Sequence, residues 1–125
     1  MREAYQYAIW RIIPALERGE CLNAGVVLFC RRAKFLDARI QLDHNRLRAL
    51  APAFDPAEAE TQLLQRARIA RGDSLGGPIA LQAQSERFGW LVSPSSTSVQ
   101  PSAVHTGLCE NPELALEHLF KRLVS

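Results

Sequence analysis

Hydrophobic side chains recur at every second position through much of the first 42 residues. Residues 4–13 alternate around aromatic and β-branched side chains, which is typical of a strand, and Pro14 ends it. Residues 22–30 are apolar on both faces, which indicates a central strand. Residues 36–42 alternate again and predict a strand with one face in water. The pattern therefore predicts an antiparallel meander of three strands at the N-terminus.

Beyond residue 42 the apolar residues follow the period of an α-helix. A short helix is predicted over residues 43–50. A longer helix is predicted to begin after Asp55, which is a good N-cap, and to run to about Arg71, with Gly72 as its C-terminal stop. A further helix is expected over residues 79–91, and a last one begins after Asn111. A short strand is expected between them, at residues 97–100.

The order of these elements predicts one α+β domain over residues 1–125. A chain of 125 residues has little room for two independent cores. We expect an antiparallel sheet, beginning with the N-terminal meander, that two or three helices cover on one face. The reason for placing the helices on one face is that only the third strand has a clearly solvent-facing side.

Composition excludes several classes of protein. A net charge of +2 is too small to indicate a nucleic-acid or membrane partner. No apolar run approaches the ~20 residues that span a bilayer, and the first residues do not resemble a secretory signal. The three cysteines lack metal-ligand spacing, so we expect reduced thiols, a cytoplasmic location, no metal and no cofactor.

Arginines gather near the end of the predicted long helix. Arg66, Arg68 and Arg71 occupy its last turns, where the helix dipole stabilises cations. We interpret this cluster as structural rather than as a site for nucleic acid.

A first polar cluster comprises Arg11, Arg18, Glu20 and Asn23. If the first two strands form a hairpin, Arg11 lies roughly opposite Asn23. Asparagine followed by Gly25 is unusual in an apolar strand. One interpretation is a polar notch that receives a ligand or another loop. The other is structural: Asn23 marks a β-bulge, and Glu20 pairs with Arg11 or Arg18.

A second polar cluster lies between residues 94 and 107, where hydroxyl groups, an amide and an imidazole stand in one loop. His105 titrates nearest neutral pH and could act as a general base. A structural role, in which hydroxyls cap backbone groups, is the other interpretation. We hypothesise that this loop covers the first cluster to form one pocket, which a separation of His105 and Glu20 beyond about 15 Å would contradict. Its candidate residues are Ser96, Thr97, Gln100, His105 and Thr106.

Two motifs in these clusters resemble a known bacterial family, the domain of unknown function 3037. One motif is an arginine-glycine-glutamate turn followed by asparagine-x-glycine-valine, at residues 18–26. The other is a serine-threonine loop that ends in histidine-threonine-glycine, at residues 96–107. The resemblance spans residues 7–124. Where the family pattern has an arginine before the serine-threonine pair, this chain has Ser95. If that arginine binds an anion in relatives, this chain lacks the contact, so the resemblance alone does not carry an anionic ligand over to it.

The resemblance implies no established activity. Relatives encoded beside HipA-like kinase domains imply a protein partner, which is an association and not a mechanism. We expect a non-enzymatic accessory or binding module that acts through the polar loop on a protein or a small anionic ligand. The alternative is a small hydrolase or nuclease-like enzyme with His105 as base, Glu20 as acid or metal carboxylate, and Arg11 or Arg18 for an anion. The sequence leaves the partner and the oligomeric state open.

Overall fold

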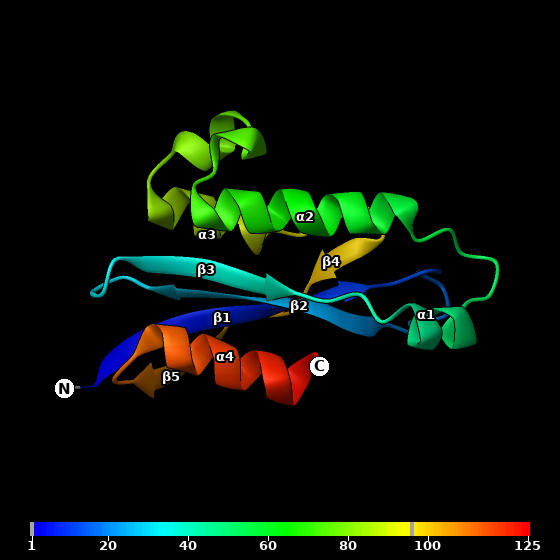
Figure 1. Ribbon diagram of the computed structural model, residues 1–125, viewed down its shortest axis with the longest axis horizontal. Coiled ribbons are helices and arrows are strands. Elements are labelled where there is room, and N and C mark those ends of the chain that lie inside the picture. Colours follow the sequence, from blue (N-terminus) through cyan, green and yellow to red (C-terminus); the bar gives the residue numbers. More distant parts are fainter. Residues whose placement is uncertain (1, 96) are drawn as a thin grey trace.

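The computed structural model describes residues 2–95 and 97–125, which form a five-stranded sheet and its covering helices (Figure 1). Strands β1 to β3 form the meander and pair antiparallel in the order β3-β2-β1. The other edge of β1 pairs antiparallel with two short strands, β4 near its end and β5 near its start. The strands are β1 (Glu3–Ile12), β2 (Leu22–Cys30), β3 (Phe35–Ile40), β4 (Val99–Pro101) and β5 (His105–Cys109).

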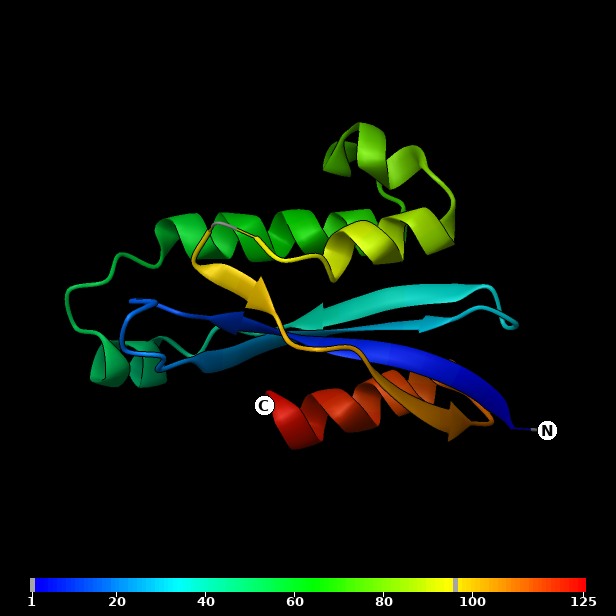
Figure 2. The same ribbon diagram turned by 180° about the vertical axis from the view of Figure 1, so that it is seen from behind.

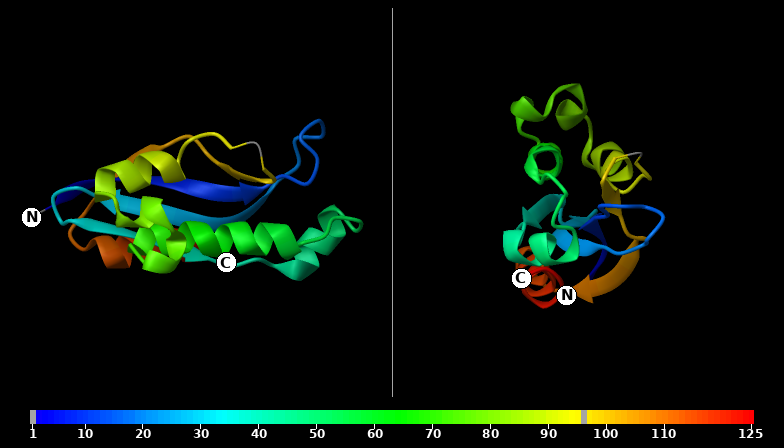
Figure 3. Two further views of the ribbon diagram at one scale, coloured as in Figure 1. Left: turned by 90° about the horizontal axis from the view of Figure 1, so that it is seen from above. Right: turned by 90° about the vertical axis from the view of Figure 1, so that its right-hand side faces the viewer.

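Helices cover both faces of this sheet. The α-helices are α1 (His44–Leu50), α2 (Ala57–Arg71), α3 (Gln84–Leu91) and α4 (Pro112–Leu123) among the described residues. Figure 3 shows α2 and α3 on one side of the sheet and α4 on the other. The predicted α+β class and N-terminal meander are confirmed. The helices were expected on one face only, and that arrangement holds for α2 and α3 but not for α4.

The sheet is covered on both faces because its central strand, β2, is apolar on both sides. Towards α2 and α3, the buried cluster includes Trp10, Val27 and Leu63. Towards α4, Val26 and Leu28 of β2 pack with buried residues of the last helix. Because β2 presents apolar side chains to both faces, a sheet covered on one side would leave half of them in water. The C-terminal helix removes that surface from solvent.

The predicted helix over residues 79–91 is split. A 3-10 turn, η2 (Pro78–Leu81), is followed by extended backbone at Gln82 and Ala83, and α3 begins at Gln84. Another 3-10 turn, η1 (Ser74–Gly76), precedes η2. The long helix ends as predicted at Gly72, whose φ of 72° lies in the left-handed region that glycine adopts freely.

A β-bulge fixes the position of α3. The register of β1 against β2 shifts beside Trp10, so that Gly25 pairs with Trp10 and Asn23 with Arg11. A Cβ on Gly25 would stand 2.9 Å from the Trp10 ring, so only glycine leaves room for this indole. The buried Trp10 Nε1–H donates to the carbonyl oxygen of Leu91 at 3.1 Å. The bulge thereby anchors the end of α3 that carries Trp90.

A buried arginine joins α3 to the end of α2. The guanidinium of Arg87 donates to the carbonyl oxygens of Ile69 and Ala70, at 3.1 Å and 3.3 Å. Those carbonyls lie in the last turn of α2, where carbonyl groups lose their regular helical partners, and the Ile69 oxygen also accepts from the backbone N–H of Gly72 at 3.1 Å. Burial lowers the pKa of Arg87. The two helices are therefore held side by side, which sets the walls of the groove described next.

Candidate functional site

A groove of about 540 Å³ lies between α2, α3 and the loop that connects α3 to β4. Figure 2 shows this connection running beside α2 before the chain enters β4. The volume falls in the range that is typical of small-ligand sites. The described residues that line the groove are Thr61, Gln62, Gln65, Arg66, Trp90, Ser93, Pro94, Ser95 and Thr97.

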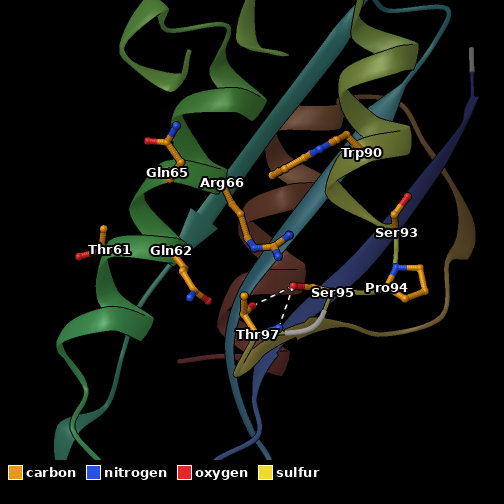
Figure 4. A pocket seen from close by; sticks show the side chains of 9 residues that line it. All are labelled: Thr61, Gln62, Gln65, Arg66, Trp90, Ser93, Pro94, Ser95 and Thr97. Atoms are coloured by element: carbon orange, nitrogen blue, oxygen red, sulfur yellow. Dashed lines mark hydrogen bonds between the residues drawn. The ribbon is translucent and has the colours of Figure 1, made fainter. Parts of the chain in front are cut away.

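Arg66 is the central polar group of the groove. The residue is only 7% exposed, and among the described residues its guanidinium has no ion pair or hydrogen bond. In Figure 4 it extends from α2 towards the loop, above Ser95 and Thr97, while Trp90 reaches across from α3. The guanidinium carbon lies 5.6 Å from the centroid of the Trp90 ring, a cation–π contact. Burial lowers the pKa of Arg66, but an arginine stays charged near neutral pH.

The loop opposite Arg66 is held by the side chain of Gln100. Its Oε1 accepts from the backbone N–H of Ser95 at 3.0 Å, and its Nε2 donates to the carbonyl oxygens of Ser95 and Thr97. The hydroxyls of Ser95 and Thr97 bond to each other at 2.8 Å. Gln100 pairs with Arg11 across β4 and β1, so the sheet positions one wall of the groove. Ser96 lies outside the described residues.

The first predicted cluster does not converge on one point. Arg18 and Glu20 pair with each other on the exposed loop between β1 and β2, and that hydrogen bond lowers the pKa of Glu20. Asn23 donates to the carbonyl oxygen of Leu123 at 3.0 Å and so ties the bulge to the end of α4. Arg11 stands between Asn23 and Gln100 in the sheet. The Arg18–Glu20 pair and the position of Asn23 beside the bulge agree with the structural interpretation of this cluster.

His105 and Thr106 lie near the other end of the sheet. His105 is exposed on β5, pairs with Tyr7, and its ring centroid is 5.3 Å from that of Tyr7. Glu20 lies two residues before Leu22, which pairs with Ile12 of β1. Ile12 is five residues beyond Tyr7, the partner of His105, and at about 3.3 Å per residue the two points on β1 lie about 17 Å apart. Figure 3 shows the loop that carries Glu20 projecting beyond the sheet, away from β5. The hypothesis of one pocket shared by Glu20 and His105 is therefore wrong.

Two central groove residues were not predicted as a site. Arg66 was interpreted as a cation near a helix end, yet Arg71 is the arginine that forms contacts there, with Asp37 and the Ala38 carbonyl oxygen. A signal was present in the sequence: Arg66 falls three residues after buried Leu63, on the apolar face of α2. Trp90 comes 24 residues later, and no sequence pattern pairs it with Arg66.

The described residues form no metal centre beside the groove. Within residues 2–95 and 97–125, no group of three or more His, Cys, Asp or Glu side chains is placed to hold a metal ion. None of the described helices is long and apolar enough to span a membrane.

The fold and the groove define a small α+β protein with a partly enclosed cationic site. The chain belongs to the family described as "Protein of unknown function (DUF3037)", whose family model matches residues 7–124. Comparison with curated proteins and with solved structures finds no match. The resemblance seen in the sequence is thereby confirmed over nearly the whole chain.

Proposed function

We propose that this protein is a non-enzymatic binding module that accepts an anionic ligand in the groove between α2, α3 and the loop around Ser95. The observation that carries the proposal is Arg66, a residue that is 7% exposed and lines the groove with no acidic partner among the described residues. Removing a cation from water without a counter-charge is costly. A bound anion would compensate that cost through charge-assisted hydrogen bonds.

The groove suits binding better than it suits catalysis. Among the described residues that line it there is no histidine, carboxylate or thiol to move a proton or attack a substrate. The hydroxyls of Ser95 and Thr97 bond to each other and have no neighbouring general base in that lining. The hydrolase alternative required Glu20 and His105 to meet, and the sheet separates them.

A protein could carry the anionic group. We retain the proposal that the module acts on a protein partner, and the family resemblance suggests a HipA-like kinase as a first candidate. We also propose that it acts in the cytoplasm. The free thiols of Cys21, Cys30 and Cys109 suit a reducing compartment.

The test is the response of thermal stability to anions. Purified protein is titrated with sodium benzoate and sodium phosphate at constant ionic strength, and the Tm is measured. A ligand that binds the folded state raises the Tm as its concentration exceeds the Kd. We expect such a rise for wild-type protein and none for Arg66→Met, which keeps the length of the side chain but removes the charge.

Arg68→Met is the matched control, because Arg68 lies on α2 but does not line the groove. It should respond to the anions as the wild type does. An equal response in all three proteins would place the anion elsewhere and contradict the proposal.

A further inference from the structure

We infer that the ligand of the groove is a monocarboxylate carried on an apolar body, such as an aryl-alkanoic acid or the C-terminal residue of a peptide. The inference rests on the proposed function and narrows it from an anion to one chemical class. Three features of the groove lead to it: its charge, the charge of its immediate surroundings, and its apolar wall.

The charge of the groove matches a single negative charge. Arg66 is the only charged side chain among the described residues that line it. The other polar lining groups are neutral amides and hydroxyls, including those of Gln62, Ser95 and Thr97. A guanidinium binds a carboxylate through two parallel N–H···O bonds, which uses its planar fork fully. One arginine therefore neutralises one carboxylate.

A dianionic phosphate fits the surroundings less well. A phosphate monoester carries about −1.5 to −2 charges at pH 7, so part of its charge would have no counter-charge in the groove. A carboxylate also lies beside the groove. The amide Nε2 of Gln62, which lines the groove, donates to Glu58 Oε1 at 3.3 Å. Glu58 adds negative charge next to the site and disfavours a second negative charge on the ligand.

The wall beside Arg66 is apolar. Trp90 is 43% exposed, although the other tryptophan of the chain, Trp10, is fully buried. Figure 4 shows the indole reaching over Arg66, with Pro94 on the loop below. A ligand whose carboxylate meets the guanidinium would place its carbon skeleton within reach of these two side chains. Apolar walls with a few convergent polar groups are typical of sites for ligands of this kind.

The experiment measures Kd by isothermal titration calorimetry on the full chain, with probes that separate charge from body. The reference probe is 4-phenylbutyrate. Its carboxamide lacks the charge, acetate lacks the body, and phenyl phosphate has an aromatic body but a dianionic head. We expect 4-phenylbutyrate to bind at least about tenfold more tightly than its carboxamide, because a charge-assisted hydrogen bond contributes about 1.5–3 kcal/mol. It should also bind more tightly than acetate, which has no apolar body to contact Trp90, and than phenyl phosphate, whose second negative charge has no counter-charge in the groove.

Two variants assign the two halves of the ligand. Arg66→Met should abolish the preference for the carboxylate over the carboxamide. Trp90→Ala should weaken 4-phenylbutyrate severalfold and leave acetate nearly unchanged. Trp90→Leu, which keeps an apolar side chain at this position, should show a smaller loss. A single cooperative thermal transition and a wild-type far-ultraviolet circular dichroism spectrum for each unligated variant check that the protein is folded.

Two peptides identify the source of the carboxylate. An acetylated pentapeptide that ends in a free leucine carboxylate is compared with its C-terminal amide. Binding of the acid form but not the amide supports a protein terminus as ligand. Binding of 4-phenylbutyrate without the peptide supports a free small acid.

The possible failures are distinguishable. If phenyl phosphate binds more tightly than 4-phenylbutyrate, or if acetate binds as tightly, the inference is overturned while an Arg66-dependent anion site still stands. If no probe binds in a way that depends on Arg66, the inference and the proposed function both fail.

Discussion

At the scale of the residue, the arginines of the chain differ in the contacts that the described residues give them. Arg87 donates to carbonyl oxygens at the end of α2, and Arg39 bonds to Asp37 and Glu117. Arg66 is buried as deeply as Arg87, but the described residues offer it only the face of Trp90. A buried charge without an acceptor is a cost to the fold, and such costs are characteristic of functional sites.

This contrast makes a prediction about stability. Arg66→Met should raise the free energy of unfolding by about 1 kcal/mol, because it removes a poorly compensated buried charge and keeps an apolar side chain of similar length. Urea denaturation of wild type and variant in ligand-free buffer measures the difference. A loss of several kcal/mol would mean that Arg66 is structural, and the proposed function would lose its main support.

Gly107 of the second motif has a structural reason. It pairs with Tyr5 across β5 and β1, and a Cβ at this position would lie 2.5 Å from the Tyr5 ring. We expect Gly107→Ala to lower the free energy of unfolding by about 1–3 kcal/mol, because either the ring or β5 must move. Chemical denaturation measures the loss.

Gly89→Ala is the matched control. Gly89 lies within α3, and a Cβ there would meet nothing within 4 Å. This substitution should stabilise the protein by up to about 1 kcal/mol, because alanine favours the helix. A neutral Gly107→Ala would show that the ring of Tyr5 yields without cost.

At the scale of the element, the central feature is the loop that Gln100 organises. The Gln100 side chain bonds to the backbone at Ser95 and Thr97, so one residue of β4 holds one wall of the groove. The polar loop predicted from the sequence is thus part of the candidate site. It contributes as a wall that faces Arg66, and His105 lies elsewhere on β5.

Gln100→Ala should therefore loosen the groove and leave the sheet intact. We expect faster amide hydrogen exchange at Ser95 and weaker binding of 4-phenylbutyrate, by about tenfold or less, because one charge-neutral anchor is lost. Gln6→Ala, at an exposed position of β1, is the control and should change neither quantity. Unchanged exchange at Ser95 in Gln100→Ala would show that the loop does not depend on this amide.

The sequence predicts elements better than it predicts their contacts. The meander follows from alternation of apolar residues, and the end of α2 follows from Gly72. The break before α3 was missed, because Gln82 and Ala83 carry no local signal for extended backbone. The groove was missed for a related reason: Arg66 and Trp90 meet only after α3 folds back on α2, and that contact is tertiary.

At the scale of the whole molecule, one sheet joins two buried clusters. β2 contributes to both, with Val27 and Phe29 on the side of α2 and Val26 and Leu28 on the side of α4. A sheet that is shared in this way couples the two halves of the core, which suits a single domain.

Leu116→Ala tests this coupling. Leu116 of α4 is fully buried against one face of the sheet. Trp10 is buried at the opposite face, and Trp90 belongs to α3, which covers that opposite face. We expect a loss of about 2–5 kcal/mol. Tryptophan fluorescence and far-ultraviolet circular dichroism should report it as one shared transition. Two separate transitions would mean that α4 and its cluster unfold independently.

The most direct test of the account is to observe the Arg66 guanidinium itself. In a nitrogen-15 NMR spectrum, the side-chain Nε–H signals of the arginines and the indole N–H signals of the two tryptophans are followed while 4-phenylbutyrate is added. The account predicts that the signals of Arg66 and Trp90 shift together and saturate, while those of Arg11 and Arg18 stay in place. Chemical-shift changes at Arg11, Arg18 and the backbone of His105, with the Arg66 signal unchanged, would contradict the account. They would instead place the binding site at the two polar clusters predicted from the sequence.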